Sequence, residues 1–319
     1  MPAPGGRPPF CHEEAQRLAR RASPGTGRPY GLQRVCRLFG MARSTASYLK
    51  ARQAVPPELR PVPRKRGPIG AATDDELVGH IRRVLAESPF TGEGYRKVWA
   101  RLRHRGIRTA SERVRRLMRE HHLQAPRRGG HPHGPKAHDG TITTEEPDTL
   151  WGTDMTTTVT TGEGLAHVFV AVDHCTCECV GLHAATGGNR FEALEPLRQG
   201  VREHLGGFEG DIARGLAIRH GHGSAYMSDD FQRELRFLGM VSSPSFVREP
   251  GGNGCAERFI RTLKEQLLWV RSSATVAELV EALRESKRTY NERWLIGRHG
   301  HRTPGQVRRD LRGGVEAAA

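Results

Sequence analysis

The sequence has few aromatic residues, few cysteines and no long hydrophobic run. Aromatic residues make up 6% of the 319 residues, and the six cysteines lack the spacing of a disulfide framework. No apolar stretch approaches the ~18 residues that a membrane span needs, and no basic start followed by an apolar stretch opens the chain. Glycine and proline together supply 58 residues, below the roughly 25–30% that marks low-complexity disorder. We therefore expect a folded cytoplasmic protein of two or three domains with no membrane partner.

Basic charge is concentrated in the first half of the chain. The net charge of +15 comes from 50 Lys+Arg and 35 Asp+Glu. Residues 1–146 carry 29 basic and 13 acidic residues, whereas residues 147–319 carry 21 and 22. A GC-rich coding sequence explains why arginine outnumbers lysine, but it does not explain this asymmetry. A strongly basic part joined to a near-neutral part indicates a nucleic-acid-binding segment joined to a second function.

The basic half begins with a loose leader at 1–29 and a first helix-turn-helix pattern at 30–53. Apolar residues recur at helical spacing before Gly40, and Ser44 with Thr45 is expected to cap the helix that follows. A plain helical hairpin is the alternative. The outward positions expected to contact DNA are Arg43, Ser44, Ser47 and Lys50.

A second helical domain is expected at 73–124, after a Pro- and Arg-rich linker at 54–72. Asp74 and Asp75 are expected to cap its first helix, and its third helix is rich in arginine. This makes the block a second helix-turn-helix candidate, with a solvated basic face on a structural bundle as the alternative. The residues expected to contact DNA, those of the third helix mostly pointing outward, are Arg96, Lys97, Arg113, Arg115, Arg116 and Arg119.

A linker at 125–147 follows and contains several histidines. No cysteine accompanies them, and their spacing fits no standard zinc site. We therefore interpret this stretch as a flexible tether.

From residue 148 onward, strand and helix patterns mix, which predicts a mixed α/β sheet. The three cysteines at 175, 177 and 179 alternate, so they are expected to share one strand face as small half-buried residues. A metal site there lacks a fourth ligand. The predicted strands are 150–160, 167–174, 177–185 and 215–220, and the predicted helices are 191–205, 228–239, 255–270 and 275–290.

Two carboxylates stand out in this half. Asp154 lies in the middle of the first strand, and Glu257 lies near the start of a helix after a glycine-rich stretch. Carboxylates that converge from separate elements give the hard oxygen ligands that Mg²⁺ prefers. Paired ions at such a site activate a water or a 3′-hydroxyl and stabilise the leaving oxygen.

The order and spacing of several short strings make residues 148–305 resemble the retroviral-integrase-like core of bacterial insertion-sequence transposases, the DDE superfamily. These strings are WGTDMT (151–156), VAVD (170–173), IRHGHGSAY (218–226), NGCAERF (253–259), TLKE (262–265), YN (290–291) and TP (303–304). The helical blocks at 30–53 and 73–124 are similar to the DNA-binding segments that precede this core.

The resemblance implies an α/β RNase H-like mixed-sheet catalytic core with C-terminal helices at 148–312, preceded by all-α helix-turn-helix DNA-binding segments. It implies metal-dependent DNA cleavage and strand transfer on element ends and target duplex, with two Mg²⁺ or Mn²⁺ ions. It also implies a homo-oligomer on DNA, because two ends must be held together. Asp154 and Glu257 carry over as catalytic metal ligands, and Lys264 as a DNA contact.

The sequence departs from the family at one position. The second catalytic carboxylate of the family is an Asp that precedes the Gly-Ser-x-Tyr string, with 35 residues between it and the catalytic Glu. That position holds Gly221, and Ala225 is also unusual. Loss of a metal ligand is expected to lower the rate on the order of 10³-fold or more.

Nearby groups are poor substitutes for the missing Asp. His220 and His222 offer imidazole, a poor Mg²⁺ ligand. Asp229 and Asp230 are expected to cap a helix, and Asp173 matches a structural or peripheral position of the family. An impaired transposase is therefore predicted, with a catalytically inactive, transposase-derived DNA-binding protein as the alternative. A transcription factor that uses only residues 30–124 leaves the second half without a role.

Overall fold

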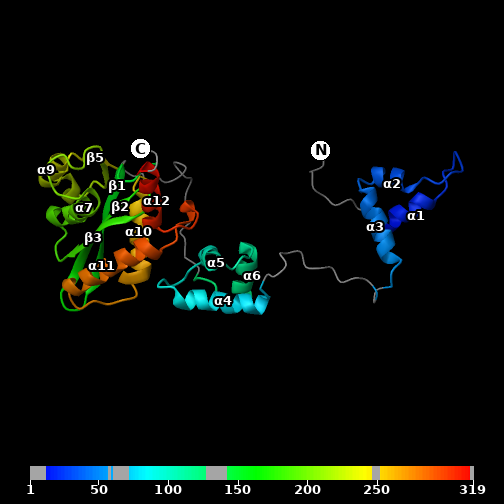
Figure 1. Ribbon diagram of the computed structural model, residues 1–319, viewed down its shortest axis with the longest axis horizontal. Helices are drawn as coiled ribbons and strands as arrows, with labels where there is room; N and C mark the ends of the chain where they lie inside the picture. The colour runs from blue at the N-terminus through cyan, green and yellow to red at the C-terminus, as the bar shows by residue number, and fades with distance from the viewer. Residues whose placement is uncertain (1–11, 57–58, 60–71, 127–141, 246–251, 317–319) are drawn as a thin grey trace. The chain divides into compact units, whose positions relative to one another are not determined.

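A computed structural model describes residues 12–56, 59, 72–126, 142–245 and 252–316 of the chain (Figure 1). The chain divides into two units, residues 1–69 and 70–319, and each is described by itself. Much of the linkers predicted at 54–72 and 125–147, including His131, His133 and His138, lies outside the described residues. In the part of the chain that is described, no helix combines the length and the apolar character needed to cross a bilayer.

The first unit contains three helices, α1 (His12–Arg20), α2 (Leu32–Leu38) and α3 (Arg43–Gln53). The expectation of a loose leader is wrong for α1, because Ala15 and Ala19 lie one helical turn apart and are buried in a small apolar cluster with Val35. Gly40 makes the expected turn with a positive φ of 61°. The expected cap at Ser44 is wrong, since α3 begins at Arg43 without a side-chain cap and Ser44 lies inside the helix.

The second unit begins with a three-helix bundle of α4 (Asp74–Glu87), α5 (Tyr95–His104) and α6 (Ser111–Glu120). Thr73, rather than either of the aspartates that were expected to do so, caps α4. Its hydroxyl accepts from the backbone N–H of Glu76, whose carboxylate accepts in return from the backbone N–H of Thr73. The bundle core is formed by Leu77, Val78, Ile81, Val84, Val98, Leu102, Val114, Leu117 and Met118.

The rest of this unit is built on a five-stranded mixed sheet of order β3-β2-β1-β4-β5, which confirms the expected RNase H-like α/β class. Long antiparallel ladders join β1 (Leu150–Thr160), β2 (Gly164–Asp173) and β3 (Cys179–Ala185). The short strands β4 (Ala217–His220) and β5 (Val241–Pro244) pair in parallel and extend the sheet beyond β1.

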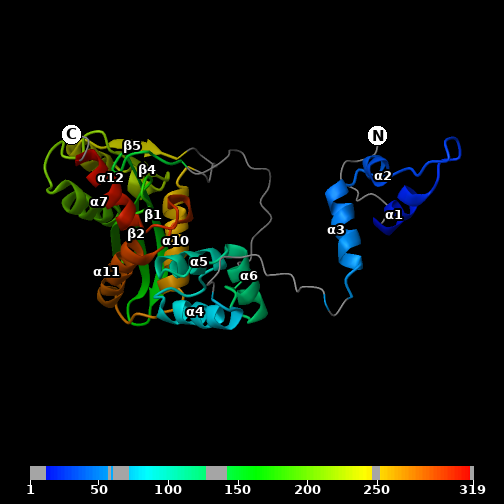
Figure 2. The ribbon, with the colours of Figure 1, turned by 45° about the vertical axis from the view of Figure 1, so that its right-hand side comes forward.

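Helices cover both faces of the sheet (Figures 1 and 2). One apolar cluster packs α7 (Arg190–Leu205), α8 (Ser224–Met227) and α9 (Asp229–Leu238) on one face. The opposite cluster packs α10 (Gly254–Leu263), the π-helical turn η2 (Lys264–Leu268) and α11 (Val276–Arg293). Residues of β2 reach both clusters because successive side chains of a strand point to opposite faces, and α10 runs along β1 and β2 (Figure 2).

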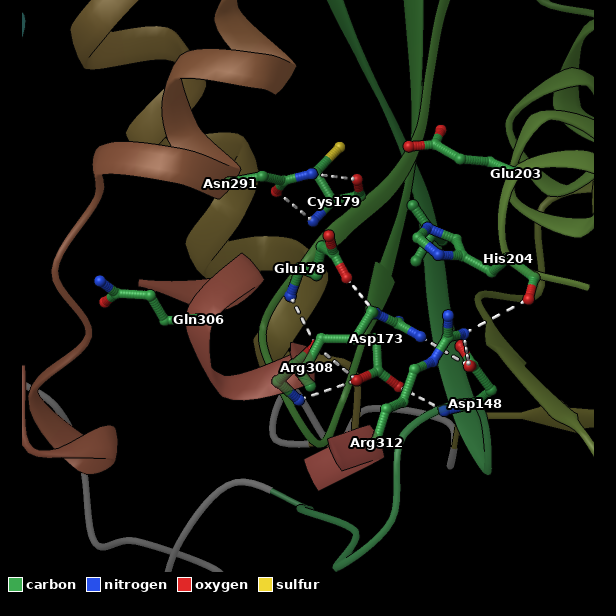
Figure 3. Close-up of polar contacts among 12 residues, drawn as sticks. Asp148, Asp173, Glu178, Cys179, Glu203, His204, Asn291, Gln306, Arg308 and Arg312 are labelled. Atoms are coloured by element: carbon green, nitrogen blue, oxygen red, sulfur yellow. Dashed lines mark hydrogen bonds and ion pairs between the residues drawn. The ribbon is translucent and has the colours of Figure 1, made fainter. Parts of the chain in front are cut away.

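The last helix, α12 (Pro304–Glu316), follows the short turn η3 (Gly297–His299) and is attached to the sheet by buried ion pairs (Figure 3). Arg308 is 5% exposed and donates to the carboxylates of Asp148, at 2.6 Å, and Glu178. Asn291 of α11 adds two 2.9 Å hydrogen bonds with the backbone of Cys179. These contacts fix the C-terminal helices on the β2–β3 end of the sheet.

The cysteine alternation does not produce one strand face. Cys175 and Cys177 lie in the turn between β2 and β3, where Cys177 has a positive φ of 60°. Cys179 is the first residue of β3. The expectation was wrong because β2 ends at Asp173 and β3 begins only at Cys179, so two of the three cysteines belong to the connection and not to a strand.

Candidate active site

The structure brings Asp154 and Glu257 together from different elements. Asp154 lies on β1 opposite Val170 of β2, so the long antiparallel ladder holds its backbone rigid. Glu257 lies in the first turn of α10, the helix that runs along β1 and β2. Burial raises the pKa of Glu257, and the nearby charge of Asp154 raises it further.

Asn253 fixes the start of α10 against β1. Its side-chain Nδ2 donates to the backbone carbonyl of Thr153 at 3.0 Å, and its backbone carbonyl accepts from the backbone N–H of Glu257 at 3.2 Å. One residue therefore connects the peptide that precedes Asp154 with the turn that carries Glu257. Asn253 is 7% exposed, so this link lies inside the protein.

Gly152 makes this close approach possible. A Cβ at this position would lie 2.4 Å from Oδ1 of Asn253 and 2.7 Å from Nε2 of His174. His174 is fully buried and is held by a 2.8 Å hydrogen bond between Nδ1 and the carbonyl of Ile142. Since that carbonyl only accepts, Nδ1 carries the proton. Glycine is thus required here for packing.

Gly221 directly follows β4, the strand that pairs with β1 on the side away from β2. The parallel ladder pairs Leu150 with Ala217 and Gly152 with Arg219, and extending this register by two residues places Gly221 opposite Asp154. A Cβ at Gly221 would meet no atom within 4 Å. The backbone therefore presents position 221 to open space next to Asp154, and a larger side chain fits there.

The surroundings shift the proton affinity of both carboxylates upward. Burial raises the pKa of Asp154, although the backbone N–H of Met155 and the ammonium of Lys264 both favour the charged form. Burial also raises the pKa of Glu257, with the Asp154 charge as the second cause. Lys264, the first residue of η2, is half-buried, and its positive charge lowers the pKa of Asp154. A cation bound between the carboxylates would relieve this unfavourable charge.

Three of the five groups considered as replacements for the missing carboxylate make other contacts. His220 is buried, with Nδ1 bonded to the carbonyl of Gly221 and Nε2 to the hydroxyl of Ser242, each at 2.8 Å. Asp173 is buried and accepts from the hydroxyl and the N–H of Thr176. Asp230 pairs with Arg190. Within the described ranges, no group of three or more His, Cys, Asp or Glu residues is arranged to hold a metal ion.

The sequence analysis did not identify Asn253 or Tyr226 as site residues. Tyr226 lies on α8, is 6% exposed, and has a pKa raised by burial and by the Asp154 charge. It therefore packs close to the first carboxylate. Both residues stand in the strings that carry the family resemblance, and this was the only signal that could have identified them.

All four predicted DNA contacts of the first unit lie on α3 and are exposed. Ala46 on the same helix is fully buried. The exposed four are Arg43, Ser44, Ser47 and Lys50.

The arginines of α6 divide into two groups. Arg113 and Arg116 donate to Asp74 at 2.5 and 2.7 Å, and these hydrogen bonds lower the pKa of Asp74 to about 2. Both side chains are partly exposed and join α6 to α4 through this pairing. Arg115 and Arg119 are exposed, as expected.

On α5, the two predicted contacts also differ from each other. Arg96 is exposed, and its guanidinium lies 5.7 Å from the ring centroid of Tyr95. Lys97 is half-buried, and its ammonium lies 2.8 Å from the ring centroid of Trp294. Arg96 thus belongs with Arg115 and Arg119 on the solvent side, whereas Lys97 faces the sheet domain.

Comparison with known proteins gives matches across most of the chain. A family model for an HTH-like domain matches residues 72–131. Transposase InsD for insertion element IS2A/D/F/H/I/K of Escherichia coli is 29% identical over 240 residues, which cover 73% of this chain and 78% of the relative. Transposase InsD for insertion element IS2-9 of Escherichia coli strain K12 has the same identity over 73% of this chain and 76% of the relative.

Two retroviral structures are among the solved structures to which this chain is similar. The simian T-cell lymphotropic virus intasome in complex with a PP2A regulatory subunit is 18% identical, covers 74% of each chain and has a TM-score of 0.44. The HTLV-2 integrase catalytic core in complex with magnesium is 18% identical, covers 51% of this chain and 97% of that chain, and has a TM-score of 0.38.

Proposed function

We propose that this chain, a homologue of the insertion-sequence transposases, binds the DNA ends of its element and carries a strand-transfer core that is impaired at position 221. The observation that carries the proposal is the geometry at β1. Asp154 and Glu257 are held together, and Gly221 occupies an open position beside them. The relatives named as IS2 transposases support the same function.

The two carboxylates supply only part of the ligand set that a divalent cation needs. Asp154 and Glu257 supply hard oxygen ligands with raised pKa values, which suits Mg²⁺ or Mn²⁺. The third donor is absent from position 221, and the described residues offer no substitute. We therefore assign these two residues as the ligands that remain for a divalent cation. With a carboxylate at position 221, the site would have the ligands for the two ions that such chemistry uses.

Two other residues near the site have supporting roles in this proposal: Lys264 binds DNA, and Asn253 holds Glu257 in place. Lys264 lies close enough to Asp154 to favour its charged form, so its ammonium can neutralise a phosphate that approaches the carboxylates. Asn253 keeps Glu257 at a fixed height along β1. Both act without contacting the bond that breaks.

DNA recognition is assigned to the two helical modules. On α3, the contacts are Arg43, Ser44, Ser47 and Lys50. On α5 and α6, they are Arg96, Arg115 and Arg119, whereas Arg113 and Arg116 stabilise the bundle through Asp74. Exposed arginines on helices supply phosphate contacts, which fix the register of a protein on the duplex. We also propose that the protein acts as a homo-oligomer on double-stranded DNA in the bacterial cytoplasm, at the nucleoid.

A binding experiment tests this part of the function. The full chain is titrated against a labelled duplex of the inverted repeat that flanks its own gene, and against a scrambled duplex of equal length. Specific proteins typically bind their site 10³-fold or more tightly than other DNA at physiological salt. Equal affinity for the two duplexes would contradict recognition of element ends.

A catalytically inactive, transposase-derived DNA-binding protein is the second candidate, and Gly221 is the observation that favours it. The two candidates differ in what Gly221→Asp does. An intact core with one missing ligand regains strand transfer, whereas a core that has lost its function more widely does not.

A further inference from the structure

Two cysteines meet beside the candidate active site, and we propose that they form a reversible disulfide when a peroxide reaches them. Cys177 lies in the turn between β2 and β3, at 174–178, and Cys255 lies in the first turn of α10, two residues before Glu257. Both are free thiols in the structure. This modification is independent of the proposed DNA function.

The fold places the two sulfurs in contact. The thiol of Cys177 donates a hydrogen bond to the sulfur of Cys255. Both residues line the same pocket, which has a volume of about 440 Å³, and Cys177 packs against the apolar cluster that contains Cys255. Because the two residues are far apart in the sequence, only the folded chain brings their thiols together.

Arg298 connects the two segments that carry the pair. Its Nη2 donates to the backbone carbonyls of His174 and Cys175, in the turn after β2, at 2.5 and 2.8 Å. Its Nη1 lies 4.0 Å from the Sγ of Cys255. The turn and the start of α10 are therefore held side by side by contacts other than the one between the thiols.

The two neighbouring cysteines of the same stretch are bonded elsewhere. The Cys175 thiol donates to the backbone carbonyl of Glu145 at 3.3 Å. The Cys179 thiol donates to the backbone carbonyl of Gly181 at 3.4 Å, and Cys179 is fully buried. Cys177 is instead half-buried and lines the pocket. A small oxidant that enters the pocket therefore reaches Cys177 before it reaches Cys179.

The reaction is a two-electron oxidation by hydrogen peroxide. The peroxide converts one thiol into a sulfenic acid and releases a water, and the second thiol then displaces a second water to form the S–S bond. The two electrons pass from the sulfurs to the peroxide oxygens, and both thiol protons end in the two waters. A dithiol, or two molecules of a monothiol, restores the pair by thiol–disulfide exchange, as a reducing cytosol would.

The disulfide would join the helix of the candidate active site to the sheet. Cys255 and Glu257 share the first turn of α10, and the other end of the bond lies on the turn that follows β2. A cross-link that closes a long loop removes freedom from the unfolded chain and so stabilises the folded one. We therefore expect the oxidised form to melt about 5–10 °C above the reduced form.

Peptide mass spectrometry of the full chain tests the assignment. The chain is treated with hydrogen peroxide, the remaining thiols are blocked with N-ethylmaleimide, and the digest is read without reduction. We expect one dominant link, between Cys177 and Cys255, formed at least about tenfold faster than any other oxidation of a cysteine in the second unit. Cys177→Ser and Cys255→Ser should each abolish the link, and the matched control Cys175→Ser should keep it.

Two results would overturn the assignment without the use of any variant. One is a link through Cys175 or Cys179, or oxidation of Cys177 or Cys255 to a sulfinic acid with no link between them. The other is an equal yield of the same link in the urea-denatured chain, which would show that the fold does not direct it.

A thermal melt gives a second reading of the same samples. The rise in Tm on oxidation should disappear after dithiothreitol is added and should be absent in Cys177→Ser. An oxidised wild type that melts no higher than the reduced one would contradict a link that restrains α10. None of these measurements uses DNA, so their failure would leave the proposed function standing.

Discussion

Replacing Gly152 with alanine should disturb the link between β1 and α10. The added Cβ would lie 2.4 Å from Oδ1 of Asn253 and 2.7 Å from Nε2 of His174, whereas ordinary contacts begin at 3.4 Å. Asn253 must therefore shift by about 1 Å, and its 3.0 Å hydrogen bond to Thr153 is the contact that gives way. His174 cannot move aside easily, because it is fully buried and bonded to Ile142.

The magnitude follows from two contributions. Overpacking of a tight site costs about 1–3 kcal/mol, and a lost hydrogen bond adds about 1 kcal/mol. Together they destabilise the second unit by about 2–4 kcal/mol. For a unit of this size, each kcal/mol lowers the Tm by about 2–4 °C, so we expect a fall on the order of 10 °C.

Differential scanning calorimetry of the full chain measures this effect. The matched control is Gly221→Ala, which adds the same methyl group where no atom lies within 4 Å. The control should change the Tm by no more than about 2 °C, in keeping with an ordinary surface substitution. Equal melting temperatures for Gly152→Ala and the wild type would refute the packing argument at Asn253.

Three further predictions concern ion pairs. Arg115→Ala should weaken DNA binding and reduce the slope of log affinity against log salt by about 1, without lowering the Tm. Arg113→Ala should instead lower the Tm, because it removes a hydrogen bond to Asp74. A salt titration and a thermal melt of each variant show whether the two roles are separate. Because Arg116 and Arg113 hold the pKa of Asp74 at about 2, below its unfolded value near 4, the stability from Asp74 is present above about pH 4 and is lost as pH falls towards 2. The wild type and Asp74→Asn should therefore differ in denaturant midpoint at pH 6 and converge near pH 2, and a constant difference would contradict the assigned pairing. Arg308→Ala removes the ion-pair partner of the buried Glu178 and one of the two arginines paired with Asp148, and should cost about 3–5 kcal/mol in urea unfolding, whereas Arg312→Ala, at 51% exposure, should cost less than about 1 kcal/mol; similar losses would refute the buried network.

The main strands and helices of the second half were predictable because their patterns are long. The predicted strand at 150–160 has the bounds of β1, and the helix predicted at 191–205 differs from α7 by one residue. β5 was missed because it has four residues and pairs along one side only, so it has no long alternating pattern. α1 was missed because it lies in a Pro- and Gly-rich stretch and buries little more than two alanines.

Candidates for the site could be chosen from the sequence only where a residue type carries the chemistry. Asp154 and Glu257 were chosen because carboxylates in this order match a family pattern. The roles of Arg113 and Arg116 were not predictable, because their partner Asp74 lies 39 and 42 residues away and is chosen by the packing of α4 on α6. The roles of Gly152 and Asn253 were not predictable either, because about 100 residues separate β1 from α10 and only the fold brings the two elements together.

Position 221 carries the central claim, and a strand-transfer assay tests it most directly. Labelled duplexes of the element's own ends are incubated with Mg²⁺ or Mn²⁺ and with the chain as given, Gly221→Asp, Gly221→Ala, or Gly221→Asp combined with Glu257→Gln. The account predicts that Gly221→Asp alone joins DNA, at least about 10³-fold faster than the chain as given, because it restores a metal ligand beside Asp154. Equal activity of Gly221→Asp and the chain as given, whether both join DNA or both fail, would contradict the assignment of Gly221 as the missing carboxylate position.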